Sequence, residues 1–288
     1  MITYREPLFR PPAEANSLIF QVSFSCPHNS CSFCQLYKGV KYQVKNNDDL
    51  FREIEWASKQ YPNTKRIFLA DGDVMFLEFK TLKNILIKLN NSFANLARVN
   101  LYANGSSILS KSKQELCELR KLKLNTFYMG LESGSDKLLH LVHKNEDSES
   151  MINAVKRAQE SDLKCSVMIL LGLGGKKYSN SHILKSSEVI NKMQPRLLSA
   201  LRFIEVDKKI IYPEYESITE YEAVNELYDL VKNLNLNRTV FTANHSSNPY
   251  PLKGRFPSDK AKLLREIERV LVHYNLDRNG VGEIPLWL

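Results

Sequence analysis

The chain has 288 residues, which is enough for one large domain or for one domain with a short appendage. Its 43% hydrophobic and 25% charged residues are typical of a globular protein with a full core. No apolar stretch approaches the roughly 20 residues that cross a bilayer, and the first residues lack the apolar core of a secretory signal. The sequence therefore argues against a membrane partner and favours the cytoplasm.

The net charge of +8 is spread along the chain rather than bunched in one segment. This distribution favours a solvated basic surface over a nucleic-acid footprint. The net positive charge leaves an RNA partner as an open alternative, without supporting it strongly.

Short apolar, β-branched runs alternate with longer stretches of helical period. Strands are predicted at residues 18–24, 66–70, 98–103, 126–131, 166–171 and 198–204. Helices are predicted at residues 48–60, 78–91, 113–121, 148–161, 182–192, 219–235 and 259–273. This order predicts an α/β fold, a partial (β/α)6 TIM-like barrel with parallel strands. A flat, doubly wound sheet is the alternative, and periodicity does not separate the two.

The predicted organisation has two parts. Residues 1–210 contain the six βα units and form the barrel. Residues 211–288 contain the last two predicted helices and read as a C-terminal helical extension that closes the barrel.

Polar, glycine-containing segments follow several of the predicted strands. They begin at Asp71, Asn104, Glu132 and Gly172. The carboxyl ends of parallel strands share one edge of a sheet, where ligands bind in α/β folds. Three cysteines follow the first strand and are expected at the same edge.

Cys26, Cys31 and Cys34 have the spacing C-x4-C-x2-C, one thiolate short of a four-ligand set. A [4Fe–4S] cluster held by them would keep its fourth iron open for chemistry. A zinc site would need a fourth ligand, for which His28 is the nearby histidine. A redox pair of Cys31 and Cys34 would leave Cys26 unexplained.

The two remaining cysteines, Cys117 and Cys165, each stand alone in an apolar pattern and read as small buried hydrophobic residues. They leave too few thiols for a second all-cysteine cluster. One metal site is expected.

The cysteine stretch resembles the signature of the radical S-adenosylmethionine (SAM) superfamily, in particular a poorly characterised single-cluster subgroup. Members carry an aromatic residue before the last cysteine, as Phe33 is here. Most have C-x3-C-x2-C, and the extra residue in this chain changes the loop shape rather than the number of ligands. The resemblance covers about residues 17–206 and implies a [4Fe–4S] cluster and SAM as cofactors.

The resemblance also implies SAM contacts after the second and third strands. Asp71, Gly72 and Asp73 hold the place of a Gly-Gly-Glu-type motif that binds the methionyl amino group, here with a shorter acid. Asn104 holds a place where polar groups meet the ribose or the methionine carboxylate. Asp71 and Gly72 could otherwise merely turn the chain.

Two further SAM contacts are implied after the fourth and fifth strands. Glu132, with Ser133 beside it, matches an acidic position that binds the ribose or amino group. Leu171 and Gly172 begin a segment that lies against adenine in the family. A flexible helix entry is the alternative for this glycine-rich segment.

The activity implied by the resemblance is reductive cleavage of SAM at the cluster. It yields a 5′-deoxyadenosyl radical that abstracts hydrogen from a substrate, for which we expect a small molecule or a cofactor precursor. An electron donor such as flavodoxin or ferredoxin is expected as a partner. The alternatives are a radical SAM enzyme that modifies RNA and a non-catalytic iron–sulfur or zinc module.

Three residues are predicted to contact the substrate. Arg202 and Glu205 end the sixth strand at the barrel mouth, although they could equally form a rim ion pair. His245 lies in the polar segment 244–248, which resembles a C-terminal motif of the same subgroup.

Overall fold

The predicted alternation of strands and helices is present in the computed structural model, which describes residues 1–205 and 211–284. Within these residues, eight strands are hydrogen-bonded in the order β1-β4-β5-β6-β7-β8-β9-β10, and β2 pairs with β3. The large sheet contains β1 (Leu18–Gln21), β4 (Arg66–Ala70), β5 (Arg98–Tyr102), β6 (Leu124–Glu132), β7 (Lys164–Leu171), β8 (Leu197–Arg202), β9 (Val240–Ala243) and β10 (Leu252–Arg255). The small sheet contains β2 (Ser23–Phe24) and β3 (Gln43–Val44).

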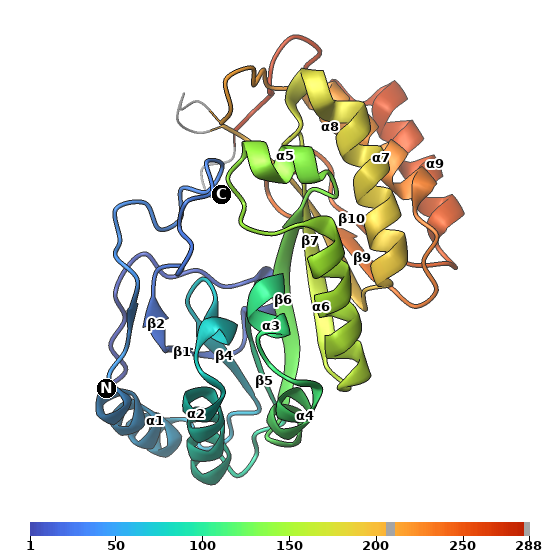
Figure 1. The fold of residues 1–288 in the computed structure, drawn as a ribbon. Coiled ribbons are helices and arrows are strands. Elements are labelled where there is room, and N and C mark those ends of the chain that lie inside the picture. The colour runs from blue at the N-terminus through green and yellow to red at the C-terminus, as the bar shows by residue number, and fades with distance from the viewer. Residues whose placement is uncertain (206–210, 285–288) are drawn as a thin grey trace. The chain divides into compact units, whose positions relative to one another are not determined.

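Helices follow most of the strands of the large sheet (Figure 1). The α-helices are α1 (Asn47–Gln60), α2 (Phe79–Ser92), α3 (Gly105–Leu109), α4 (Lys113–Lys121), α5 (Asp136–Leu141), α6 (Ser148–Glu160), α7 (Gly175–Met193), α8 (Glu220–Asn233) and α9 (Lys260–His273). Two short 3-10 helices are η1 (Pro12–Glu14) and η2 (Val74–Phe76). No helix of the described chain is long and apolar enough to span a bilayer.

Contacts divide the chain into two units. The N-terminal unit contains Met1–Asn29, Cys34–Met129 and Asn153–Cys165. The C-terminal unit contains Ser30–Phe33, Gly130–Ile152 and Ser166–Leu288. Strands β6 and β7 contribute residues to both units.

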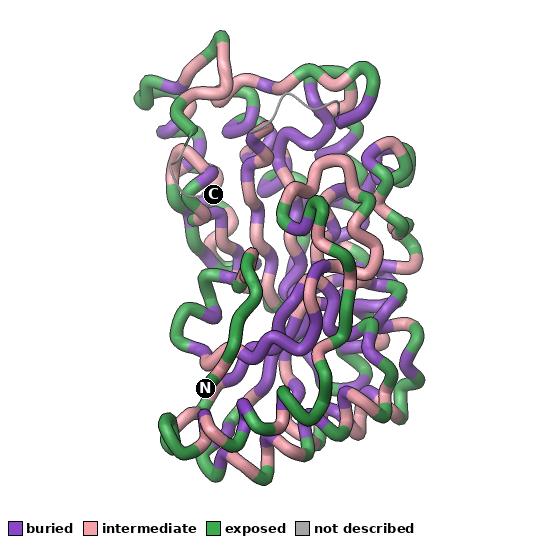
Figure 2. Tube along the Cα trace, turned by 90° about the vertical axis from the view of Figure 1, so that its left-hand side faces the viewer, coloured by how far each residue is buried: buried purple, intermediate pink, exposed green. Residues whose placement is uncertain are grey.

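The N-terminal unit is built on parallel strands β1, β4 and β5. Helices α1 and α2 bury apolar residues spaced three or four apart, so one face of each helix packs inward. Figure 2 shows the same division of buried and exposed residues along the chain. The predicted first strand is interrupted, because Val22 leaves the β1 register and β2 turns to pair antiparallel with β3.

A buried carboxyl ties the N-terminal segment of this unit to its strands. Glu14 is 1% exposed and accepts hydrogen bonds from Ser17, from Asn100 of β5 and from Tyr128 of β6. Burial, and then the hydrogen bond to Glu14, raise the pKa of Tyr128, so its hydroxyl stays protonated and donates.

In the C-terminal unit, β7, β8 and β9 are parallel and β10 closes the edge antiparallel to β9. Helices α7, α8 and α9 lie side by side in Figure 1. Helix α8 begins with a capping box in which Thr219 and Glu222 satisfy each other's backbone donors.

The predicted fold class is confirmed as a mostly parallel α/β sheet with intervening helices. Strands β9 and β10 were not predicted, so the C-terminal region is not wholly helical: β9 adds a parallel strand to the six expected. Helix α7 begins at Gly175 rather than at residue 182, because apolar spacing marks only its C-terminal part, where Ile183, Val189, Ile190 and Met193 are buried. The predicted domain boundary at 210 and the end of the resembling stretch at 206 lie outside the described residues, and the two-part division stays a prediction.

Candidate active site

The three cysteines lie on an irregular loop between β2 and β3. None of the three is in a disulfide, and all are partly buried. Cys26 and Cys34 belong to the N-terminal unit, and Cys31 belongs to the C-terminal unit with Ser32 and Phe33. The backbone N–H of Ser32 donates to Val142 at 2.9 Å, which fixes the middle of the loop to residues that follow α5.

Asp71, directly after β4, is bonded to both ends of the cysteine loop. Its buried carboxyl accepts from the backbone N–H of Ser25 at 3.4 Å and from the hydroxyl of Tyr37 at 3.2 Å. A third donor is the side-chain amide of Gln21, at 2.8 Å. Burial raises the pKa of Asp71 to about 6, against the opposing effect of these hydrogen bonds. Asp71 is therefore occupied in holding the loop.

Gly72 lies against the first cysteine. A Cβ atom at this position would come within 2.9 Å of the Cys26 Cβ and 3.0 Å of a Tyr37 ring carbon. Real side chains do not approach so closely, so only glycine fits here without displacing the loop.

Asp73 and Asn104 contact each other, as their placement after neighbouring parallel strands predicts. The Asp73 carboxyl accepts from the backbone N–H and side-chain amide of Asn104, at 3.2 and 3.1 Å, and from Ser107 at 2.6 Å. These bonds hold the start of α3 to the loop after β4.

The donor set fits a [4Fe–4S] cluster. Among the described residues, no three His, Cys, Asp or Glu side chains form a group that could hold a single metal ion. A four-iron cluster makes a different demand, since each thiolate binds its own iron. Three cysteines on one short loop, none of them in a disulfide, match that demand, and Gly72 makes room beside Cys26.

Glu132 ends β6 in an unusual conformation and is paired with a lysine that the sequence did not single out. Its φ of 61° lies in the left-handed region, which few non-glycine residues adopt. Its carboxylate is 3.6 Å from the Lys144 ammonium, and both side chains are largely buried. Burial raises the pKa of Glu132, and Lys144 opposes that rise.

Helix α7 fixes the residues after Glu132. His182 is fully buried, and burial lowers its pKa to about 4, so the ring is neutral. Its Nε2–H donates to Leu170 at 3.0 Å, and its Nδ1 accepts from the Ser133 hydroxyl at 2.8 Å. Ser186 accepts from the backbone N–H of Gly134 at 2.8 Å.

Gly172, after β7, is bonded to a buried carboxyl of α8. Its N–H donates to Glu226 at 2.6 Å, and Ser179 donates to the other carboxyl oxygen at 2.6 Å. Burial raises the pKa of Glu226 to about 7. Glu226 was not predicted, because one Glu in an amphipathic helix normally faces solvent.

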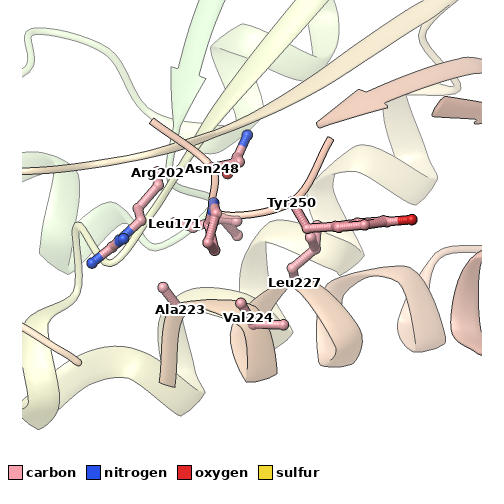
Figure 3. Close-up of a pocket in the computed structure, with 8 residues that line it drawn as sticks. Leu171, Arg202, Ala223, Val224, Leu227, Asn248 and Tyr250 are labelled. Carbon is pink, nitrogen blue, oxygen red and sulfur yellow. The ribbon is translucent and has the colours of Figure 1, made fainter. Parts of the chain in front are cut away.

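Leu171 and Arg202 are register partners at the ends of β7 and β8. Both line a small, mostly apolar cavity with Asn248 and Tyr250 (Figure 3). The Arg202 guanidinium donates to the carbonyl of Val281 and lies 3.6 Å from the Glu220 carboxylate. Arg202 is thus largely engaged within the protein, and its contact with substrate stays a prediction.

The segment 244–248 is attached to the end of β8. Ser247 accepts from the backbone N–H of Arg202 at 3.1 Å, and Asn248 donates to Ala200 at 3.0 Å. His245 Nδ1 accepts from the backbone N–H of Ser247 at 3.2 Å, which places the proton of the neutral ring on Nε2. Glu205 accepts a long bond from Ser217 at 3.4 Å.

The sequence pattern that defines the radical SAM superfamily matches residues 20–179. The chain belongs to this superfamily. Enzymes of this superfamily bind a [4Fe–4S] cluster and SAM as cofactors and cleave SAM reductively.

One curated relative is the heme chaperone HemW of Buchnera aphidicola, which is 21% identical over 153 residues. The match covers 50% of this chain and 40% of HemW.

Two solved structures share the fold. Coproporphyrinogen III oxidase (HemN) of Escherichia coli has a TM-score of 0.54 at 15% identity, covering 88% of this chain and 52% of that chain. The hydrogenase maturase HydG of Carboxydothermus hydrogenoformans has a TM-score of 0.52 at 18% identity, covering 76% and 52%. The chain thus spans about half the length of these proteins.

Gly72→Ala should lower the iron content of the reconstituted protein. The added methyl would push against Cys26 and Tyr37, at a typical overpacking cost of about 1–3 kcal/mol. Iron and sulfide analysis with the visible absorption spectrum measures the loss. Gly39→Asn is the matched control, because Gly39 has nothing within 4 Å and its left-handed φ suits Asn. Equal iron in both variants would contradict the assigned contact.

Lys144→Met should weaken SAM binding and move its pH dependence. Without the ammonium, burial alone acts on Glu132, so its pKa rises further and the carboxylate becomes protonated at a higher pH. As the pH falls, the SAM dissociation constant should then begin to rise at a higher pH than in the wild type. At pH values below the pKa of Glu132 in both proteins, the difference should be about tenfold for each unit of pKa displacement. Calorimetric titration over pH measures this, and exposed Lys156→Met is the control. A profile that does not move would rule out Glu132 as a charged SAM contact.

Proposed function

We propose that this enzyme applies radical SAM chemistry to a small molecule or a cofactor precursor. The observation that carries the proposal is the loop of three cysteines outside any disulfide, whose two ends bond to the buried Asp71. Such a loop offers three ligands and leaves one position of a four-iron cluster open. Cys26, Cys31 and Cys34 are the proposed ligands.

The chemistry that the reduced cluster and SAM supply together is a radical able to take hydrogen from an unactivated C–H bond. The residues after the strands are proposed to orient SAM for that step. Gly72 would receive the methionyl amino group through its backbone, since Asp71 and Asp73 are engaged in loop contacts. Glu132 would contact the ribose or the amino group, and residues 172–174 would lie against adenine.

His245 is the strongest of the proposed substrate contacts. Its loop fixes the ring with a proton on Nε2, so the ring presents a donor suited to a carbonyl or carboxylate of the substrate. Burial lowers its pKa, which keeps the ring neutral near pH 7. Arg202, at the end of β8, and Glu205, three residues later, are the other two proposed substrate contacts.

The substrate class is supported by the cysteine count. Cys117 and Cys165 are isolated in α4 and β7, so the 288 residues offer thiols for one cluster. Sulfur-inserting members need a second cluster as the sulfur source. The names of two similar proteins, a heme chaperone and a coproporphyrinogen oxidase, agree with a cofactor-related molecule. A flavodoxin or ferredoxin in the cytoplasm is the proposed electron donor.

Anaerobic reconstitution, followed by dithionite and SAM, should produce 5′-deoxyadenosine and methionine. Cys31→Ala should abolish both the brown chromophore and the cleavage. Cys117→Ala, a change of a partly buried thiol in α4, should preserve both. A fully assembled cluster that yields no 5′-deoxyadenosine would refute the enzymatic proposal and favour a binding module.

The same assay separates the substrate classes. Cleavage should be stimulated by a metabolite fraction and left unchanged by tRNA. Stimulation by tRNA, with binding that weakens steeply as salt increases, would favour RNA modification instead.

A further inference from the structure

A short segment, residues 211–218, lies along the glycine turn after β7. We name it the strap. The hydroxyl of Tyr212 donates to the carbonyl of Gly174 at 2.6 Å, and that of Tyr215 donates to the carbonyl of Gly172 at 3.2 Å. The backbone N–H of Lys176 donates to the carbonyl of Glu216 at 2.9 Å. The strap therefore bonds to the backbone of the turn at three places.

The strap approaches the turn so closely that Gly175 has no room for a side chain. A Cβ on Gly175 would come within 2.7 Å of the Glu216 carbonyl and 3.0 Å of the Tyr212 hydroxyl. Gly172 and Gly175 also have φ of +85° and +52°, a region that favours glycine. The two glycines thus have two roles: they adopt the backbone conformation of the turn, and they allow the strap to pack against it.

Aromatic packing holds the strap in place. Tyr212 is buried in a cluster with Leu173, and its ring centroid lies 5.3 Å from that of Tyr215 and 5.8 Å from that of Tyr178. Phe33 of the cysteine loop packs against the same cluster. Ion pairs of Lys176 and Lys177 at the rim are exposed and contribute little.

Both strap hydroxyls remain hydrogen-bond donors. Burial raises the pKa of Tyr212 and of Tyr215 above that of a free tyrosine. Glu226 of α8 accepts the N–H of Gly172. The orientation of the peptide groups around Gly172 and Gly174 is consequently set by side chains from outside the turn.

We propose that Tyr212 and Tyr215 are positioning residues for SAM, which hold the turn at residues 172–174 in the shape that receives adenine. The inference rests on the adenine contact proposed above. Both tyrosines lie beyond the segment 20–179 that matches the superfamily pattern. The adenine site would therefore depend on residues outside that segment.

The test uses the reconstituted holoenzyme and three ligands: SAM, 5′-deoxyadenosine and methionine. Tyr212→Phe and Tyr215→Phe each remove one hydroxyl and keep the ring. Each should raise the dissociation constants of SAM and 5′-deoxyadenosine about five- to tenfold, the effect of one lost hydrogen bond. Methionine, which lacks adenine, should bind as in the wild type. Anaerobic calorimetry measures all three.

Tyr178→Phe is the matched control. Tyr178 belongs to the same aromatic cluster, but its hydroxyl interacts with Lys177 and Glu214 rather than with the turn. Iron content should be equal in all variants, and the melting temperature of the two strap variants should fall by about 2–4 °C at most, as one lost hydrogen bond implies. If Tyr212→Phe fails to hold iron, Tyr215→Phe carries the same test through the less buried tyrosine.

Unchanged SAM affinity in both variants would overturn the inference. Equal weakening of SAM and methionine, with a larger fall in melting temperature, would assign the tyrosines a general structural role and also overturn it. Tighter SAM binding would mean that the hydroxyls compete with adenine for the carbonyls, again against the inference. A wild-type enzyme that binds neither SAM nor 5′-deoxyadenosine would instead overturn the proposed function itself.

Discussion

The buried carboxyl of Asp71 is the constraint on which the cysteine loop depends. A carboxyl that is 1% exposed needs donors, and it takes them from the strand that precedes the loop and from both loop ends. The loop itself has no helix or strand to define it. Asp71, directly after β4, therefore holds the two ends of the loop, and Gly72 next to it admits Cys26.

The loops of the C-terminal unit follow the same rule with the roles reversed. There the buried polar side chains belong to helices, and the residues of the loops form hydrogen bonds to them. His182 and Ser186 of α7 hold the residues after β6, and Glu226 of α8 holds Gly172. In both units, hydrogen bonds in a dry environment orient backbone that secondary structure does not.

Much of this could be predicted from the sequence. Apolar runs located β4 and most other strands because buried parallel strands are nearly continuous in hydrophobicity. The cysteine spacing predicted three cluster ligands, since few chemistries need three thiols in nine residues, and this assignment stays a proposal. The contact between Asp73 and Asn104 followed from their position after neighbouring parallel strands.

The supporting residues could not be predicted, for a physical reason. Lys144, His182 and Glu226 are isolated polar residues in segments where such residues usually face water, and their burial depends on partners far away in sequence. Strand β9 was missed because four residues carry too little alternation to detect. The hydrogen-bond partner of a polar residue depends on the tertiary structure, and hydrophobic periodicity along the sequence does not predict it.

The left-handed Glu132 has a consequence for the residue two positions before it. Its carboxylate folds back over Gly130, so closely that a Cβ there would come within 1.8 Å of the Oε1 atom. A side chain at residue 130 would push this carboxylate off its path and away from the Lys144 ammonium, which lies 3.6 Å from it. The missing side chain of Gly130 thus helps to decide where the carboxylate of Glu132 stands.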